Sequence, residues 1–158
     1  MHLIDCHITG HMESCVAAIN GGSFPHFSCC RRIYRHSLAG AILIENSTLS
    51  DSLRLQGVVA QGLNSKVFLI NSSISNCNGT CVLALQGGCM DIQSCNVFSS
   101  TSMQGVCAQG KGSRINMANT RIYGNPHVFC RCGVTCIVDV CLLRSCRLHA
   151  DLCGLSQW

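Results

Sequence analysis

The segment VFLINSSI, residues Val67–Ile74, decides the fold, because the chain repeats its pattern of apolar and polar residues along its whole length. The other copies are MHLIDCHI at 1–8, ILIENSTL at 42–49, MDIQSCNV at 90–97, INMANTRI at 115–122 and CLLRSCRL at 141–148. The first, third and eighth residues of every copy are apolar or cysteine, and apolar residues alternate as they do in β-strands. The fifth residue, called position zero from here on, is Asp, Asn or Ser. A period of mostly 23–26 residues is typical of stacked coils that bury their apolar faces against each other.

A second strand-like signal returns eleven to fourteen residues after position zero in the first five copies. It reads Val16/Ala18, Val58/Ala60, Val82/Ala84, Val106/Ala108 and Cys130/Cys132. The sequence therefore predicts an all-β, right-handed parallel β-helix of about six to seven coils, whose strands pair in parallel about 4.8 Å apart. The first two zero positions, Asp5 and Asn46, are separated by nearly two periods instead of one. This interval predicts either a degenerate coil around residues 24–27 or a long loop.

One domain is expected to span residues 1–158. It divides into a less regular part at 1–41, well-patterned repeats at 42–148 and a tail at 149–158. Met1 already occupies the first apolar column, and the sequence after Ser145 is too short for another full coil. Because solenoids normally protect their open edges, we expect a segment of a larger protein that lacks its caps.

The polar residues at position zero predict a ladder of stacked, inward-facing side chains at one bend of each coil. Asn46, Asn71 and Asn119 would carry it, with Asp5 and Ser94 as substitutes. Such a ladder would satisfy the backbone groups of the bend along the stack. The alternative is the ordinary preference of Asn for turns.

Cysteines follow the repeat, which argues against a disulfide scaffold despite their number of 15. Cys6, Cys95 and Cys146 directly follow position zero, where Ser and Thr stand in other copies, so we predict reduced, structural thiols. The odd count and the lack of a signal-peptide pattern at the N-terminus favour a cytoplasmic protein. No apolar run is long enough to be typical of a membrane span.

The motifs Ile44–Leu49, Ile92–Val97 and Met117–Ile122, each followed by turns such as Gln104-Gly105-Val106, resemble the repeat of right-handed parallel β-helix proteins with the pectin-lyase-like fold. The resemblance covers about 42–148 well and the part before it loosely. It implies the fold but does not select a function, since members include polysaccharide lyases and hydrolases, phage tailspikes and non-enzymatic binding modules.

Catalytic groups of the kind found in polysaccharide-cleaving enzymes are not apparent in the sequence. The seven acidic residues scatter over different positions of the repeat, so we predict no catalytic residues and no cofactor. His127, Cys130, Cys132 and Cys136 could supply four zinc ligands. Their spacing is not that of repeated CxxC pairs, and core thiols without a metal are favoured.

Candidate binding residues lie at outward positions that the fold does not require. Leu43, Phe68 and Ile70 would form an apolar patch across two coils, which suggests a partner surface unless another segment covers it. Arg121 and Arg147 fall two residues after position zero, and with Arg144 they would form a basic stripe or an ordinary solvated surface. No aromatic residues are interleaved with basic ones, so the sequence argues against nucleic acid as a partner.

The sequence therefore favours a non-enzymatic binding or scaffold module with a protein partner, a glycan being the other ligand considered. The alternative is part of a carbohydrate-active enzyme or glycan-binding protein whose catalytic residues lie elsewhere. A metal-binding, cysteine-rich domain is the third hypothesis.

Overall fold

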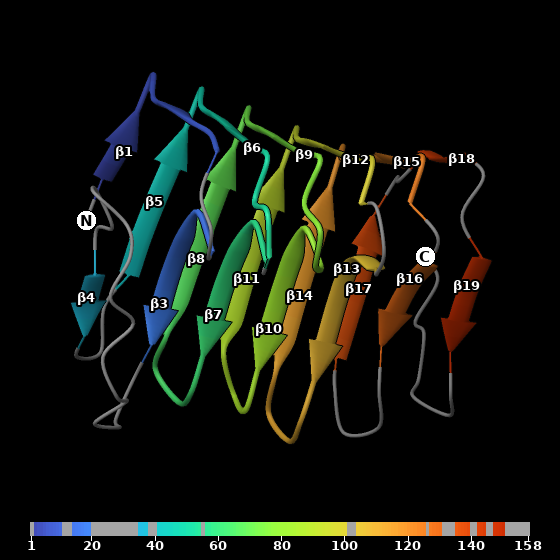
Figure 1. Cartoon of the computed structure of the whole chain (residues 1–158). Coiled ribbons are helices and arrows are strands. Elements are labelled where there is room, and N and C mark those ends of the chain that lie inside the picture. The colour runs from blue at the N-terminus through green and yellow to red at the C-terminus, as the bar shows by residue number, and fades with distance from the viewer. Residues whose placement is uncertain are drawn as a thin grey trace.

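A computed structural model gives the architecture of the chain (Figure 1). It describes residues 2–10, 14–19, 35–37, 41–54, 56–100, 104–125, 127–130, 135–139, 142–144 and 147–150, with the backbone alone at 35–37 and from residue 127 onward. Every pair of neighbouring strands is parallel, and no helix occurs among these residues. The protein is a parallel β-solenoid, as the repeat predicts.

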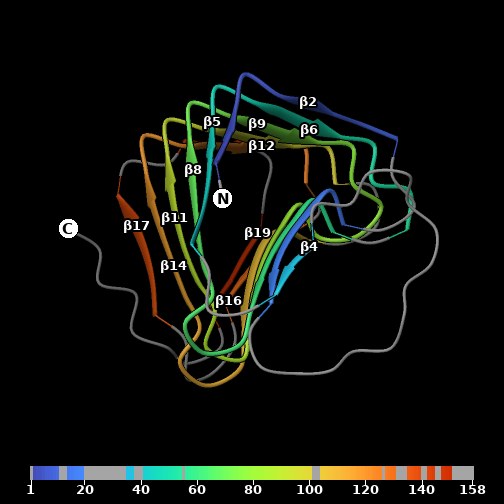
Figure 2. The ribbon, with the colours of Figure 1, turned by 90° about the vertical axis from the view of Figure 1, so that its left-hand side faces the viewer.

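Three parallel sheets form the three sides of the solenoid. Sheet A contains β1 (His2–Ile4), β5 (Ala41–Glu45), β8 (Lys66–Ile70), β11 (Cys89–Gln93), β14 (Arg114–Ala118) and β17 (Thr135–Asp139). Sheet B contains β2 (His7–Ile8), β6 (Thr48–Ser50), β9 (Ser73–Ser75), β12 (Asn96–Phe98), β15 (Arg121–Tyr123) and β18 (Leu142–Arg144). Sheet C contains β4 (Arg35–Ser37), β3 (Val16–Ile19), β7 (Val58–Gln61), β10 (Val82–Leu85), β13 (Gln104–Gln109), β16 (His127–Cys130) and β19 (Arg147–Ala150). The view along the stack shows the sheets enclosing a common interior (Figure 2).

The apolar columns of the repeat form the core. The third residues of successive copies pair across sheet A, and all of them are buried: Leu3, Ile44, Leu69, Ile92 and Met117. Sheet B contributes the eighth residues, among them Leu49, Ile74, Val97 and Ile122, each fully buried. The predicted inward face is therefore correct from the first copy through the copy at 115–122.

The last copy was placed wrongly by the sequence pattern. Met117 pairs with Val138 and Ile122 pairs with Leu143, so the sixth copy begins at Cys136 instead of Cys141. In sheet C, Val106 pairs with Val128, which replaces the predicted Cys130. The prediction failed because Leu143 fits two different apolar columns, and because the connection from β15 to β16 is shorter than that from β12 to β13.

The first two copies are neighbours in the stack despite the long interval between them in the sequence. β1 pairs directly with β5, and β3 pairs directly with β7, so the two copies are neighbours in the stack. β4 pairs with the opposite edge of β3. Residues 24–27, where a degenerate coil was considered, lie outside the described residues. The intervening segment is thus an insertion between sheets C and A.

Position zero turns the chain from sheet A to sheet B, and its side chain points outward. Asn46, Asn71 and Asn119 have φ values of 49°, 48° and 51°, and their side chains are exposed. This left-handed conformation is tolerated best by Asn and Asp after glycine. The predicted inward asparagine ladder is therefore wrong, and turn preference explains the column.

The ladder exists one residue later and consists of hydroxyls and thiols. Each side chain donates to the carbonyl two residues before it, as Ser47 Oγ does to Glu45 at 2.7 Å and Cys95 Sγ to Gln93 at 3.2 Å. From the second coil onward each side chain also accepts from a backbone N–H of the preceding coil, as Ser72 Oγ does from Ser47 N at 3.1 Å. The members are Cys6, Ser47, Ser72, Cys95 and Thr120. Cysteine exchanges with Ser and Thr here because its thiol makes the same two contacts.

A second bend, between sheets B and C, repeats this construction. Its turning residues, five positions after position zero, also have positive φ, as Asp51 (56°), Asn76 (52°) and Ser99 (56°) do. The residue after the turn again points inward: Asn125 accepts from Ser100 N at 2.8 Å and donates to the carbonyl of Tyr123 at 3.0 Å. Buried polar side chains therefore define two corners of each coil.

The ladder predicts a large difference between two small substitutions at Ser72. Ser72→Ala should lower the free energy of unfolding by about 1–3 kcal/mol, because it leaves the buried N–H of Ser47 without its acceptor. Ser72→Cys should cost less, since Cys95 fills the same position in the next coil. Urea denaturation of the two variants measures the difference, and equal losses would contradict the ladder.

Candidate functional site

The outer face of sheet A is the part of the surface that brings predicted binding residues together. Leu43 pairs with Phe68 in the neighbouring strand, and both side chains point away from the core. Ile70 lies two residues after Phe68 on the same face, and all three side chains are partly exposed. The predicted apolar patch is thus contiguous across β5 and β8.

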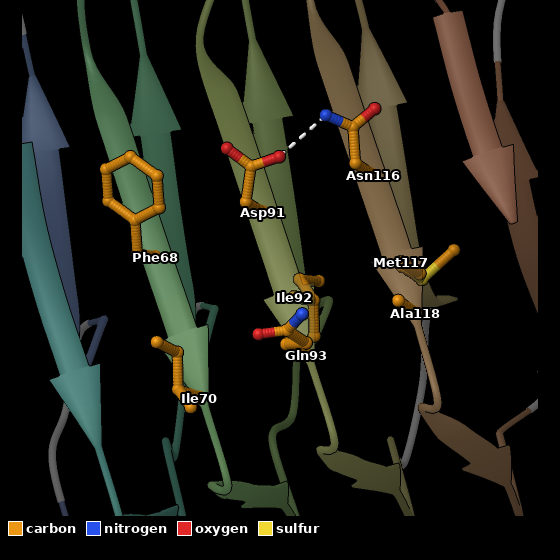
Figure 3. Close-up of a pocket in the computed structure, with 8 residues that line it drawn as sticks. All are labelled: Phe68, Ile70, Asp91, Ile92, Gln93, Asn116, Met117 and Ala118. Carbon is orange, nitrogen blue, oxygen red and sulfur yellow. Dashed lines mark hydrogen bonds between the residues drawn. The ribbon is translucent and has the colours of Figure 1, made fainter. Parts of the chain in front are cut away.

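A groove of about 390 Å³ begins at this patch and crosses β11 and β14 (Figure 3). Its lining residues are Phe68, Ile70, Asp91, Ile92, Gln93, Asn116, Met117 and Ala118. Phe68, Asp91 and Asn116 occupy one column, and Ile70, Gln93 and Ala118 occupy the next. The groove therefore has an apolar end on β8 and a polar end on β11 and β14.

The polar end is organised by one short hydrogen bond. Asn116 Nδ2 donates to Asp91 Oδ1 at 2.6 Å, and the two side chains lie side by side on neighbouring strands (Figure 3). This bond leaves the second carboxylate oxygen of Asp91 and the amide oxygen of Asn116 available as acceptors. The exposed Gln93 adds a further amide beside them. Such a site can orient a ligand by hydrogen bonds next to an apolar surface.

Sequence reasoning missed the polar half of this groove. Asp91, Gln93 and Asn116 share the outward columns of Phe68 and Ile70 in the aligned repeats, and that alignment was the available signal. Leu43 lies next to Phe68 but does not line the groove. The patch and the groove together form one surface, which we call the sheet A surface: Leu43, Phe68, Ile70, Asp91, Gln93, Asn116 and Ala118.

The predicted basic residues lie away from the sheet A surface. Arg121 is exposed on β15 of sheet B, Arg144 belongs to β18 of sheet B, and Arg147 belongs to β19 of sheet C. The prediction that Arg121 and Arg147 share a column is wrong, because Arg121 pairs with Leu142 and Arg147 pairs with His127. This error follows from the misplaced last copy.

Sheet C offers a less accessible outer face. Val59, Leu83 and Cys107 point away from the main core yet are 5%, 7% and 5% exposed, and they form a second small apolar cluster. Ala17 and Leu85 pack against it. The candidate ligand surfaces among the described side chains therefore lie on sheets A and B.

The described side chains include no group of three or more His, Cys, Asp or Glu arranged to hold a metal ion. The side chains of His127, Cys130, Cys132 and Cys136, the zinc candidates, lie outside this described set. Burial raises the pKa of the Cys95 thiol, which keeps it protonated as a ladder member.

Nor does the described part of the chain contain any helix of the length and apolarity that crossing a membrane requires. No family model, no curated protein and no solved structure matches this chain.

Proposed function

We propose that this protein is a non-catalytic binding module that captures a protein partner on the sheet A surface. The carrying observation is the groove in which Phe68 and Ile70 adjoin the hydrogen-bonded pair of Asp91 and Asn116. Protein interfaces commonly place apolar contact residues beside polar groups that form hydrogen bonds, as the two ends of this groove do. The resemblance to pectin-lyase-like β-helices supports a module of this kind, because non-enzymatic binding proteins occur among them.

Rigidity of the scaffold supports the same proposal. The residues under the groove, Ile92 and Met117, are each 2% exposed and belong to the core. Phe68 and Asn116 are held by parallel strands on both sides. A partner would therefore meet a preformed surface, which lowers the entropy lost on binding.

Among the described side chains, the carboxylates at the groove are not arranged as the pair that most glycoside hydrolases use. Glycoside hydrolysis in most enzymes uses two carboxyl groups about 5–10 Å apart. Asp91 is the one carboxylate among the described residues that line the groove, and its neighbour in the column is the amide Asn116.

A glycan is the second candidate ligand, because Phe68 lies beside amide and carboxylate acceptors. Apolar faces of sugar rings pack on aromatic side chains, and their hydroxyls donate to such acceptors. Under this alternative the chain would be part of a carbohydrate-active or glycan-binding protein whose catalytic residues lie elsewhere.

Peptide display tests the protein proposal directly. Peptides selected on the wild-type chain should bind Phe68→Ser at least about 5-fold more weakly, which is the effect of removing an interface anchor worth over 1 kcal/mol. Leu63→Ser is the matched control, because Leu63 is 69% exposed and does not line the groove. Isothermal titration calorimetry measures the affinities, and urea denaturation checks that both variants fold.

Two outcomes would contradict the proposal. Selected peptides that bind Phe68→Ser as tightly as wild type would show that the sheet A surface is not the site. Cleavage of a polysaccharide by the wild-type chain, lost in Asp91→Asn, would establish the enzyme alternative. A glycan array with the same Phe68→Ser variant distinguishes sugar ligands from peptides.

A further inference from the structure

Two aromatic rings stack on the outer face of sheet B, away from the groove. The ring centroids of Phe98 on β12 and Tyr123 on β15 lie 4.9 Å apart, and the ring planes differ by 2°. Phe98 pairs with Tyr123 in the register of the sheet, so the rings are spaced as the strands are. Tyr123 is 38% exposed, which leaves part of this stack in solvent.

Polar and basic residues flank the stack on the same sheet. Arg121 lies two residues before Tyr123 on the same face of β15 and is exposed. Asn96 holds the corresponding position before Phe98 and pairs with Arg121. In the preceding strand the column continues with Ser75, which is only 5% exposed, so the more accessible ring of the stack is that of Tyr123.

Positive charge is concentrated in the coils that carry the stack. Residues 89–151 contain six basic residues, Lys111, Arg114, Arg121, Arg131, Arg144 and Arg147, against the three acids Asp91, Asp139 and Asp151. The backbone of Arg144 pairs with Tyr123, which places a basic residue at the next position of the aromatic column. An anionic partner is therefore favoured at this end of the molecule.

We propose that the outer face of sheet B binds single-stranded nucleic acid, with a base stacked on the exposed Tyr123 ring of the Phe98–Tyr123 pair and a phosphate contacting Arg121. Aromatic platforms beside basic residues are the general means of binding single strands, because every base has a flat face and every linkage a negative charge. The expectation against nucleic acid rested on the absence of aromatics interleaved with basic residues along the chain. The fold supplies that arrangement across coils, between residues of neighbouring repeats.

A single strand fits these observations better than a duplex or an acidic protein segment. Base faces in a duplex are covered by their neighbours, so the rings would contribute nothing to its affinity. An acidic peptide would form ion pairs with the basic residues, but its carboxylates have no need of an aromatic ring to stack on. A ligand that contacts both the aromatic rings and the basic residues must be a flexible polyanion with exposed planar groups, which describes a single-stranded nucleic acid.

Fluorescence anisotropy with a labelled 12-nucleotide single-stranded DNA tests the proposal on the full chain. Tyr123→Leu, which keeps an apolar side chain but removes the ring, should weaken binding by about 5- to 100-fold. Arg121→Ala should reduce the slope of log affinity against log salt by about 0.7, the value for one phosphate contact of a single strand. Phe68→Ser removes an aromatic ring from sheet A and should leave this affinity unchanged.

Equal affinity for a duplex of the same length or for polyglutamate would overturn the proposal, as would unchanged binding by Tyr123→Leu. If Tyr123→Leu fails to fold, photocrosslinking of the wild-type chain to a bromouracil-containing strand replaces it. Crosslinks at Phe98 or Tyr123 support the site, and crosslinks confined to other sheets reject it. Loss of peptide binding in Phe68→Ser with retained DNA binding separates this site from the sheet A surface.

Discussion

Leu69→Asp is expected to unfold the protein. Leu69 is fully buried in β8, between Ile44 and Ile92 of the neighbouring strands. A carboxylate there would lose its hydrating water without gaining a hydrogen-bond donor or a cation. The free-energy cost of burying such an uncompensated charge exceeds the free energy of unfolding of a typical domain. Leu69→Ala should still fold, with a loss of about 2–5 kcal/mol in the free energy of unfolding.

The neighbouring residue supplies the control for this prediction. Phe68 lies on the outer face of the same strand, so Phe68→Asp should change the free energy of unfolding far less. Circular dichroism should show loss of the β signal in Leu69→Asp alone. A folded Leu69→Asp, or a spectrum of the wild-type chain dominated by helix, would contradict the architecture.

Gly88→Ala is the second substitution with a large expected effect. A Cβ at Gly88 would lie 2.1 Å from the carbonyl oxygen of Ala60 and 2.6 Å from its carbonyl carbon. Both atoms belong to the backbone of sheet C and cannot move aside as a flexible side chain would. Separating the coils would disrupt their hydrogen bonds, so we expect a loss of about 3 kcal/mol or more.

Gly112→Ala is the matched control in another coil of the same bend. The nearest atom to a Cβ there is 3.6 Å away, in ordinary contact, while φ is +81°. Gly112→Ala should lower the free energy of unfolding by about 1–2 kcal/mol, solely because alanine is strained at a positive φ. Thermal denaturation of both variants shows which one loses more stability. A smaller loss in Gly88→Ala than in Gly112→Ala would contradict the close approach of the coils at Gly88.

The sequence was sufficient to predict the fold because the core depends on repeated, local choices. Ile44, Leu69 and Ile92 occupy one column in the sequence and one layer in the structure. The pattern failed where two registers satisfied it equally, as at Leu143. It also placed the polar ladder one residue early, because Asn71 marks the turn and Ser72, directly after it, makes the inward bonds.

The surfaces were predictable only in part, because a binding site depends on side-chain size and on neighbours distant in the chain. Phe68 and Ile70 could be assigned outward from the alternation of β8. The groove beside them is also lined by the small Ala118 and by the hydrogen-bonded Asp91 and Asn116, which the repeat does not specify. Likewise the stack of Phe98 and Tyr123 becomes apparent only when the coils are in register.

The direct pairing of β1 with β5 and of β3 with β7 also bears on how such a chain can grow and be engineered. A long stretch separates Ile19 from Ala41, yet the strands before and after it keep the register of the other coils. Residues inserted between a strand of sheet C and the next strand of sheet A therefore leave the register of the stacked coils unchanged. The corresponding bends at 62–65 and 110–113 are natural positions at which to graft recognition loops, because each is bracketed by paired strands.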